Sequence, residues 1–341
     1  MRSGMICLLL SAGILLGGCA EAEPLKSGHH VPVHLTTWQS YWDMEEGSRD
    51  YASLHKKLDA VSCFAVCYDE NDMLYVPDEV RAMAAKYRGK KTETYLSFTN
   101  DIIGKRCSEK DRELLRRLLH DDTAVDHTVA DIVALAKEFG VQGVELDYES
   151  FAKDEKLLQR YLILTYRLST ACVQNNLKLR IVLEPSVPFD AGFAKGPEYV
   201  VMLYNLYGKH SGPGAKADRA FIEKMLAKME ALPEKRAVAF ATGGCLWQDY
   251  GLCGLKTGER RFITEREAVS LAEKHRAAPE RDAESAALHF TYAADGHQTE
   301  VWYADSETLN TWITLAANRG IASVSIWRLG GNVDIGQLHV Q

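Results

Sequence analysis

Three carboxylates stand at every second position of one short apolar segment, residues 141–149. Successive side chains of a β-strand point to opposite faces, so Glu145, Asp147 and Glu149 share one face if this segment is a strand. Burial of three acids in a row costs free energy unless each is paired with a cation or protonated, and such a cost is most often accepted where the acids have a catalytic role. A half-exposed strand with a solvated acidic face is the alternative, but the flanking sequence is too apolar for an edge strand. The spacing therefore predicts catalysis, with Glu149 as the first candidate for a catalytic acid.

The rest of the chain supplies elements that can position these acids. Short apolar runs alternate with longer amphipathic runs, which favours a parallel sheet wrapped by helices. The eight predicted strands cover residues 31–37, 60–66, 92–97, 141–147, 178–183, 199–204, 236–241 and 322–327. Helical patterns cover residues 78–87, 110–119, 128–139, 155–174, 218–230 and 307–318. We therefore expect an α/β fold, a (β/α)8 TIM barrel with its chemistry at the C-terminal mouth.

One connection is too long for a structureless loop in a compact domain. It runs from residue 243 to about 306, between the seventh and eighth predicted strands, and contains alternating apolar runs at 288–292 and 300–303. We expect a small α+β insertion there, on the active face of the barrel, where it can wall one side of a cleft.

Polar and aromatic residues gather where the predicted strands end. In chain order they are Trp38, Tyr41, Trp42, Tyr68, Asp69, Asn100, Asp147, Glu149, Glu184, Tyr204, Asn205, Trp327 and Arg328. Aromatic rings stack on the apolar faces of sugars, and carboxylates protonate a leaving oxygen, so this combination is typical of glycosidases. A single aromatic residue is more often core than site, so the prediction depends on their joint placement.

The first residues indicate export. Residues 1–18 combine Arg2 with an apolar run that is too short to span a bilayer, and they end in Gly17-Gly18 before Cys19. This ending resembles the lipobox of bacterial lipoproteins, in which the cysteine after the cleavage site receives a lipid; an ordinary signal peptide with an incidental cysteine is the alternative. Residues 19–30 then form a flexible tether. We expect an exported lipoprotein of the cell envelope, facing the periplasm or the outer surface, with a globular part over residues 31–341.

Six further cysteines follow Cys19. Export permits disulfides without requiring them, and Cys245 with Cys253 is the most plausible pair because a glycine-containing turn separates them. Their spacing does not resemble a zinc site, and we expect no bound metal. Cys63 and Cys67 lie in an apolar run and are expected to pack as small hydrophobic residues.

Composition narrows the range of partners. The chain has 40 basic and 47 acidic residues and a formal charge of -7, with no long basic run, which argues against binding to nucleic acid. No second segment reaches membrane-spanning length, so we expect membrane contact only through the N-terminal lipid. About 320 residues remain after processing, which suits one barrel with an insertion. We expect a monomer.

The acidic segment resembles the signature of family 18 of the glycoside hydrolases, the chitinase-like barrels. The family signature on the fourth strand, DGxDxDxE, is matched by residues 142–149, Gln-Gly-Val-Glu-Leu-Asp-Tyr-Glu. The resemblance implies that Glu149 is the catalytic acid and that Asp147 is the supporting aspartate. It covers nearly the whole mature chain.

Two further motifs carry the resemblance. The family's Met-x-Tyr-Asp on the sixth strand corresponds to residues 202–205, and Tyr204 matches the tyrosine that contacts the substrate's acetamide group. Trp327, within the run 325–330, matches the tryptophan that floors the sugar site. Together with residues 300–305, this run is most similar to the branch of bacterial spore-cortex and cell-wall hydrolases. The resemblance and the predicted placement give Trp38, Tyr68, Asn100, Glu145, Asn205 and Trp327 as candidate substrate-binding residues.

The sequence departs from the family pattern in three places. The outer aspartates of the signature are Gln142 and Glu145, the Ser-x-Gly-Gly of the third strand is replaced at residues 97–100, and Asn205 replaces an aspartate. The longer Glu145 is expected to crowd or reorient Asp147, and Asn205 to weaken polar contacts with substrate or Asp147. These changes affect rate and pH optimum rather than the type of reaction.

The resemblance implies a retaining, substrate-assisted mechanism without metal or organic cofactor. Glu149 protonates the glycosidic oxygen while the substrate's own 2-acetamido oxygen attacks the anomeric carbon, and Asp147 and Tyr204 hold the acetamide group. The implied substrate is a β-linked, N-acetylglucosamine-containing glycan, such as a peptidoglycan fragment or a chitin-type oligosaccharide. The competing hypothesis is a non-catalytic, chitinase-like glycan-binding lipoprotein, because changes such as Glu145 and Asn205 can follow the loss of catalysis.

Overall fold

The structure, a computed structural model, describes residues 32–105, 107–233, 235–249 and 258–340. The predicted signal peptide, the tether, Cys19 and Cys253 lie outside these ranges, so they stay predictions, as does the pairing of Cys245 with Cys253. None of the helices in the described ranges has the length and apolar character needed to cross a membrane.

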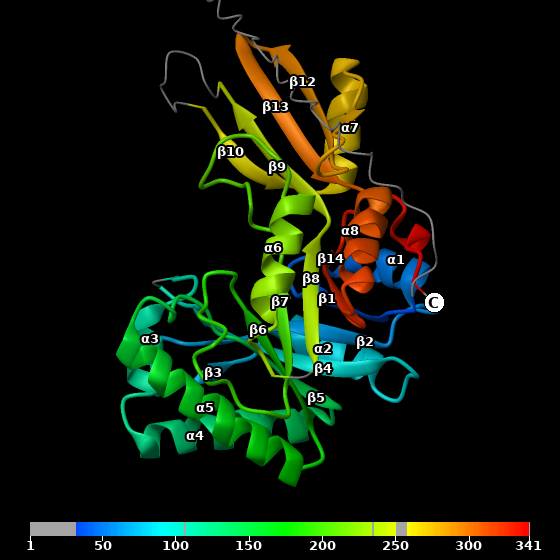
Figure 1. Ribbon diagram of the computed structural model, residues 1–341. Coiled ribbons are helices and arrows are strands. Elements are labelled where there is room, and N and C mark those ends of the chain that lie inside the picture. Colours follow the sequence, from blue (N-terminus) through cyan, green and yellow to red (C-terminus); the bar gives the residue numbers. More distant parts are fainter. Residues whose placement is uncertain (1–31, 106, 234, 250–257, 341) are drawn as a thin grey trace, which may run out of the picture.

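A closed barrel of eight parallel strands forms the body of the described chain (Figure 1). Around the barrel the order is β1, β14, β8, β7, β6, β5, β4 and β2, and pairing of β1 with β2 closes the ring. The strands are β1 (His34–Ser40), β2 (Ala60–Tyr68), β4 (Glu93–Ile102), β5 (Gly143–Asp147), β6 (Lys178–Leu183), β7 (Glu198–Met202), β8 (Arg236–Ala241) and β14 (Ser323–Leu329). The predicted TIM barrel is confirmed, and each predicted strand overlaps an observed one.

Helices surround the barrel. They are α1 (Met44–Leu54), α2 (Asp78–Tyr87), α3 (Arg112–Leu118), α4 (Asp122–Phe139), α5 (Glu155–Gln174), α6 (Arg219–Met229) and α8 (Ser306–Asn318). An aspartate directly before α3, α4, α5, α6 and α8 accepts a hydrogen bond from a backbone N–H of the first turn, which fixes where each helix begins. The cap Asp121 explains why α4 starts before residue 128, where the apolar pattern begins. Helix α1 was not predicted.

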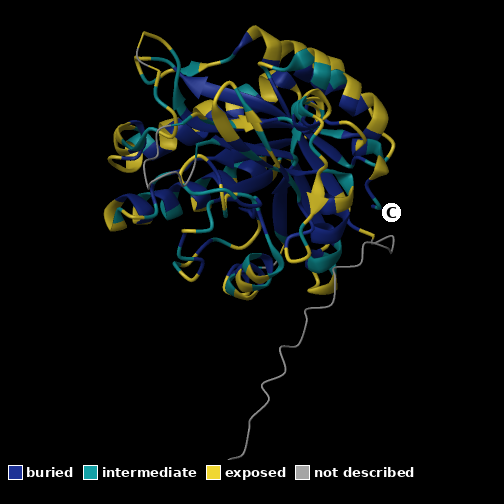
Figure 2. Cartoon of the chain, turned by 90° about the horizontal axis from the view of Figure 1, so that it is seen from above, coloured by how far each residue is buried: buried dark blue, intermediate teal, exposed yellow. Residues whose placement is uncertain are grey.

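Two apolar layers follow from the alternation of side chains along the strands. One lies between strands and helices, and a smaller one around Trp38, Phe64 and Met202 lies inside the barrel. Figure 2 shows the buried residues along the central strands and the exposed residues on the outer faces of the helices. Interior positions of the barrel are therefore a packed core in which any charged group needs a partner.

The insertion between β8 and β14 is confirmed as an α+β unit. It comprises β9 (Gly243–Gln248), β10 (Arg260–Ile263), α7 (Glu265–His275), β11 (Glu280–Arg281), β12 (Leu288–Ala294) and β13 (His297–Ala304). The strands form a five-stranded antiparallel sheet, and α7 packs against it over a separate small core that includes Leu246, Phe290 and Val301. The short β3 (Leu74–Tyr75) instead pairs antiparallel with β2.

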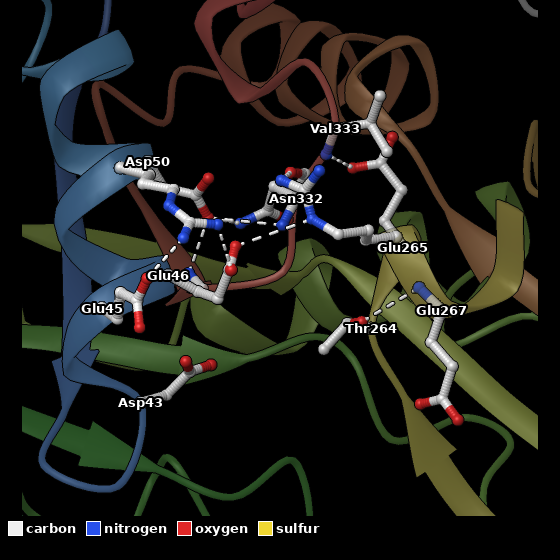
Figure 3. A network of polar contacts seen from close by, with 12 residues as sticks. Asp43, Glu45, Glu46, Asp50, Thr264, Glu265, Glu267, Asn332 and Val333 are labelled. Atoms are coloured by element: carbon white, nitrogen blue, oxygen red, sulfur yellow. Dashed lines mark hydrogen bonds and ion pairs between the residues drawn. The ribbon is translucent and has the colours of Figure 1, made fainter. Parts of the chain in front are cut away.

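A polar network joins α1, the start of α7 and the segment after β14 (Figure 3). Buried Asp50 accepts hydrogen bonds from the backbone N–H of Gly330 at 2.6 Å and from the side-chain amide of Asn332 at 2.6 Å. Glu265 accepts one from the backbone N–H of Val333 at 3.0 Å. The network fixes the chain directly after β14, and thereby the position of Trp327 near the end of that strand.

We predict that Asp50→Ala lowers the free energy of unfolding by about 2–4 kcal/mol, because the backbone N–H groups of Gly330 and Asn332 and the Asn332 side-chain amide all lose their acceptor. Chemical denaturation monitored by circular dichroism measures the change. Asp131→Ala, at an exposed position of α4, is the control and should change stability by less than about 0.5 kcal/mol. Equal effects of the two substitutions would show that the network does not stabilise the fold.

Candidate active site

The strand β5 places the three acids of the 141–149 segment in and just above the interior of the barrel. Glu145, Asp147 and Glu149 are 0%, 8% and 7% exposed, so all three carboxylates are largely removed from solvent. Tyr148, between the last two, belongs to the outer apolar layer. The strand ends at Asp147, which leaves Glu149 just beyond it, at the C-terminal mouth.

Glu145 is held by three other strands. The Ser62 hydroxyl donates to its Oε1 at 2.8 Å, and the indole N–H of Trp38 donates to the same oxygen. Arg180 Nη1 lies 3.2 Å from Oε2, and the β5–β6 register places these two residues side by side. Burial raises the pKa of Glu145, although Arg180 and the hydrogen bonds act in the opposite direction.

Arg180 was not predicted as a site residue. Its Nε lies 2.9 Å from Glu198 Oε2, so the guanidinium bridges two carboxylates. The rings of Trp38 and Tyr95 lie 5.9 and 5.6 Å from the guanidinium carbon. A basic residue on the same face of an apolar strand as an acid on its neighbour is the sequence signal that could have revealed this pair.

Asn100, on β4, fixes the main chain at Glu149. Its side-chain oxygen accepts from the Glu149 N–H at 2.8 Å, and its amide nitrogen donates to the carbonyls of Glu149 at 3.2 Å and Asp111 at 3.1 Å. The oxygen and the nitrogen of the buried Asn100 amide are therefore both hydrogen-bonded to the main chain. We infer that Asn100 positions the candidate acid, while its predicted contact with substrate stays a prediction.

Lys110 lies directly against the candidate acid. Its Nζ donates to Glu149 Oε2 at 2.6 Å, and its backbone N–H donates to Asp101 Oδ1 at 2.7 Å, which holds the loop after β4 in place. The lysine side chain is 45% exposed, whereas the Glu149 side chain is only 9% exposed, so the pair lies at the border between the interior and solvent. This contact was not predicted, because no local pattern indicates where a loop side chain will lie.

The electrostatic surroundings of Glu149 suit an acid. Burial raises the pKa of Glu149 to about 7, with Lys110 acting to lower it and Glu184 and Asp101 acting to raise it further. For Lys110, burial acts to lower the pKa, but the charge and hydrogen bond of Glu149, together with the charges of Asp147 and Glu184, outweigh it and the pKa is raised. Near neutral pH, Glu149 therefore exists in both protonated and ionised forms, as a group that gives and later takes a proton requires.

Asp147 lacks a matched partner. Burial, followed by the charges of Glu149 and Glu145, raises the pKa of Asp147 well above its ordinary value. Its buried Oδ1 has no hydrogen-bond partner among the described residues. Buried polar atoms of native proteins are nearly always bonded, so an orphaned carboxylate oxygen at a barrel mouth is typical of a group that binds a ligand.

Tyr204 and Asn205 follow β7, since that strand ends at Met202. Burial, then the charges of Asp147 and Glu149, raises the pKa of Tyr204 well above its ordinary value. Its hydroxyl therefore remains a hydrogen-bond donor beside the two acids. Asn205 is exposed at the same end of the barrel.

Aromatic rings cluster at the ends of β1, β2 and β14. The Trp327 ring lies 5.8 Å from Trp38, 4.8 Å from Phe64 and 6.5 Å from Trp42 between ring centroids. Trp38 is buried, Trp327 is partly exposed, and Trp42 is exposed. The peptide bonds Phe64–Ala65 and Trp327–Arg328 are cis. The partly exposed Trp327 is thus available to a ligand, while Trp38 contacts Glu145 and Arg180.

Tyr68 lies apart from this group. It packs in the layer between strands and helices, and its hydroxyl lies 2.5 Å from that of Tyr148. Its predicted contact with a glycan stays a prediction that this placement does not favour. Within the described ranges, no three His, Cys, Asp or Glu side chains are grouped as metal ligands would be.

Comparisons with known proteins agree with this geometry. The family model for glycosyl hydrolases family 18 matches residues 37–332. The uncharacterized glycosylase YvbX of Bacillus subtilis (strain 168) is 25% identical over 96% of this chain and 94% of its own. The cortical fragment-lytic enzyme of Bacillus cereus is 27% identical over 74% of this chain, a match that spans 60% of that longer protein.

Solved structures support the same fold. The Bacillus cereus spore cortex-lytic enzyme SleL superposes with a TM-score of 0.74 at 19% identity, over 91% of this chain and 73% of that one. A chitinase from Chromobacterium violaceum gives a TM-score of 0.77 at 18% identity, over 89% of this chain and 96% of that one. At these identities the likeness shows the fold alone, and the family assignment comes from the family model. The chain belongs to family 18 of the glycosyl hydrolases.

Proposed function

We propose that this protein is a retaining, substrate-assisted glycosidase that cleaves β-linked glycans containing N-acetylglucosamine. The observation that carries the proposal is the pair of adjacent acids in different states: Glu149 with a pKa raised to about 7, and Asp147 with an unpartnered, buried oxygen. Two titratable groups whose surroundings differ are typical of acid–base sites. The family assignment supports glycan hydrolysis in general.

In the proposed first step, Glu149 donates its proton to the glycosidic oxygen, and the bond from that oxygen to the anomeric carbon breaks. The oxygen of the substrate's own 2-acetamido group attacks the anomeric carbon and forms a cyclic oxazolinium ion. Ionised Glu149 then removes a proton from water, which opens the ring. The anomeric configuration is retained because two displacements occur at the same carbon.

Asp147 and Tyr204 orient the acetamide group in this mechanism. The Asp147 carboxylate accepts from the acetamide N–H and offsets the positive charge that develops on its nitrogen. The acetamide thereby gives the unpartnered Asp147 oxygen the hydrogen bond that it lacks in the free protein. Tyr204 donates to the acetamide oxygen, and Trp327 lies under the sugar ring.

Peptidoglycan fragments are the favoured substrate class. The Bacillus cereus relative is described as a cortical fragment-lytic enzyme, whereas a structural neighbour is a chitinase. We further propose that Cys19 carries a lipid and holds the enzyme, as a monomer, in the cell envelope, where peptidoglycan is present. This second proposal rests on the sequence of residues 1–30.

We predict that Glu149→Gln lowers turnover by at least about a hundredfold, because the glutamine cannot donate the proton, while glycan binding persists. The test incubates the chain without its first 19 residues with chitooligosaccharides and with purified peptidoglycan, and identifies the products by mass spectrometry. Glu113→Gln, on the exposed face of α3, is the matched control. If the wild type cleaves neither glycan and both forms bind glycan equally, the protein is a glycan-binding protein and not a glycosidase.

We predict that Lys110→Met moves the alkaline limb of the kcat/KM profile upward by about one pH unit. The ammonium group favours ionised Glu149, so its removal raises the pKa of the acid above about 7 and preserves the protonated form at higher pH. Lys105→Met, an exposed lysine in the same loop, should leave the limb in place. If the alkaline limb of Lys110→Met stays at the wild-type pH or moves to lower pH, the assignment of Glu149 as the acid is contradicted.

We predict that Cys19→Ser abolishes incorporation of labelled palmitate in cells and releases the protein from the membrane fraction, because the acyl-bearing lipid is attached through the thiol. Cys7→Ser, within the segment removed on processing, should keep both properties. Continued labelling of Cys19→Ser would exclude the lipid attachment.

A further inference from the structure

The contact between Lys110 and Glu149 joins the candidate acid to a partly exposed cation. An ammonium group only donates hydrogen bonds, so Glu149 Oε2, at 2.6 Å from Nζ, acts as an acceptor. The proton of the neutral acid then lies on Oε1. In the proposed reaction Oε1 therefore faces the glycosidic oxygen, and Nζ of Lys110 contacts the other oxygen of the same carboxyl group.

Lys110 is the basic residue among the described side chains whose charges act most strongly on Glu149. The others are acids on three separate segments, namely Asp147, Glu184 and Asp101. A negatively charged substituent of the substrate would be repelled by these acids and attracted by Lys110. Because the lysine side chain is 45% exposed, its remaining N–H donors can reach such a group without unfolding the loop.

The chemistry of the substrate class places a carboxylate near this position. In a β-1,4-linked glycan the leaving oxygen is O4 of the leaving sugar, and O3 is on the adjacent carbon. N-acetylmuramic acid carries a lactyl ether on O3, whereas chitin has a hydroxyl there. A lactyl carboxylate on the leaving sugar is therefore close to the oxygen that Glu149 protonates. The distance between the two is no longer than a lysine side chain.

We propose that Lys110 binds the carboxylate of a 3-O-lactyl ether on the leaving sugar, and that the enzyme thereby favours glycan strands whose lactyl group is free over strands in which it is bonded to peptide as an amide. This proposal rests on the proposed glycosidase function and names its preferred substrate. An amide hydrolysis that detaches the peptide from the lactyl group is then the class of reaction that supplies the substrate.

Substrate binding also changes the state of the acid in this scheme. The ammonium group of Lys110 favours the ionised form of Glu149 in the free enzyme. When the lactyl carboxylate also attracts this ammonium group, its effect on Glu149 becomes weaker. The protonated form is then favoured in the complex, when a proton must be donated. Lys110 thus pairs with Glu149 in the free enzyme and also with the lactyl carboxylate in the complex, and this change requires no movement of the barrel.

The test compares two oligosaccharides of identical sugar sequence, alternating N-acetylglucosamine and N-acetylmuramic acid, one with free lactyl groups and one with their methylamides. Chitotetraose serves as a neutral reference. The full-length protein in detergent should show a kcat/KM about tenfold higher for the free acid than for the amide, mainly through KM. The ratio of kcat/KM between two substrates of one enzyme at one pH cancels any change in the pKa of Glu149 in the free enzyme.

Lys110→Met should reduce this ratio to about one, Lys110→Arg should restore most of it, and Lys105→Met should leave it at the wild-type value. Circular dichroism and the melting temperature show whether each variant folds. A wild-type ratio of one, or a ratio that persists in Lys110→Met, overturns the proposal.

Failure of the proposed function gives a different result. If the wild type cleaves none of the three glycans, calorimetric binding of the free-acid and amide oligosaccharides still tests Lys110, since binding needs no turnover. Equal affinities would then overturn the carboxylate site as well, whereas a preference for the free acid that Lys110→Met removes would support it.

Discussion

The strand β5 and the two residues after it impose one constraint on the interior, since they bury three carboxylates, Glu145, Asp147 and Glu149. Three like charges in a low-dielectric core repel one another and lose their hydration, so each needs its own compensation. Glu145 has Arg180, Glu149 has Lys110, and Asp147 has neither. The partners come from β6 and from the loop after β4, so both strands that flank β5 must be in place before the acids are accommodated. The acid without a partner is the one for which the proposed mechanism supplies a partner from the substrate.

The pair formed by Glu145 and Arg180 accounts for the longer side chain at position 145. Its carboxylate accepts hydrogen bonds from residues of β1 and β2 and forms an ion pair with Arg180 of β6, which also pairs with Glu198 on β7. Removal of one partner from a buried ion pair leaves an uncompensated charge, which is strongly destabilising, whereas the intact pair adds little net stability. We therefore interpret the pair mainly as a device that fixes the charge and orientation of Glu145. The expectation that Glu145 disturbs Asp147 stays a prediction.

The barrel was predictable from the sequence because its signals are local. The apolar run of β6 and the helical stripe of α5 occupy the predicted residues, and both patterns depend only on spacing along the chain. Helix α1 escaped prediction because its buried face consists of Gly47, Asp50, Tyr51 and Leu54, which is a weak apolar pattern. Lys110 could not be assigned, since its contact joins residues 39 positions apart and comes from a loop, whereas Arg180 stands opposite Glu145 on a neighbouring strand and left a signal that was missed. The placement of Asn100 against the Glu149 backbone also depends on the register between β4 and β5.

The closure of the barrel between its first and last strands affects how the chain folds. Thr37 of β1 donates to the carbonyl of Ile326 of β14, a separation of 289 residues. Contacts of such separation form late, because a long loop must close before they yield any free energy. Until β14 is in place, β1 has one unpaired edge, and such an edge is a template for intermolecular pairing. In the export that we propose, the chain emerges from its N-terminus and presents this edge until β14 follows, so its need for a chaperone should last until the end of translocation.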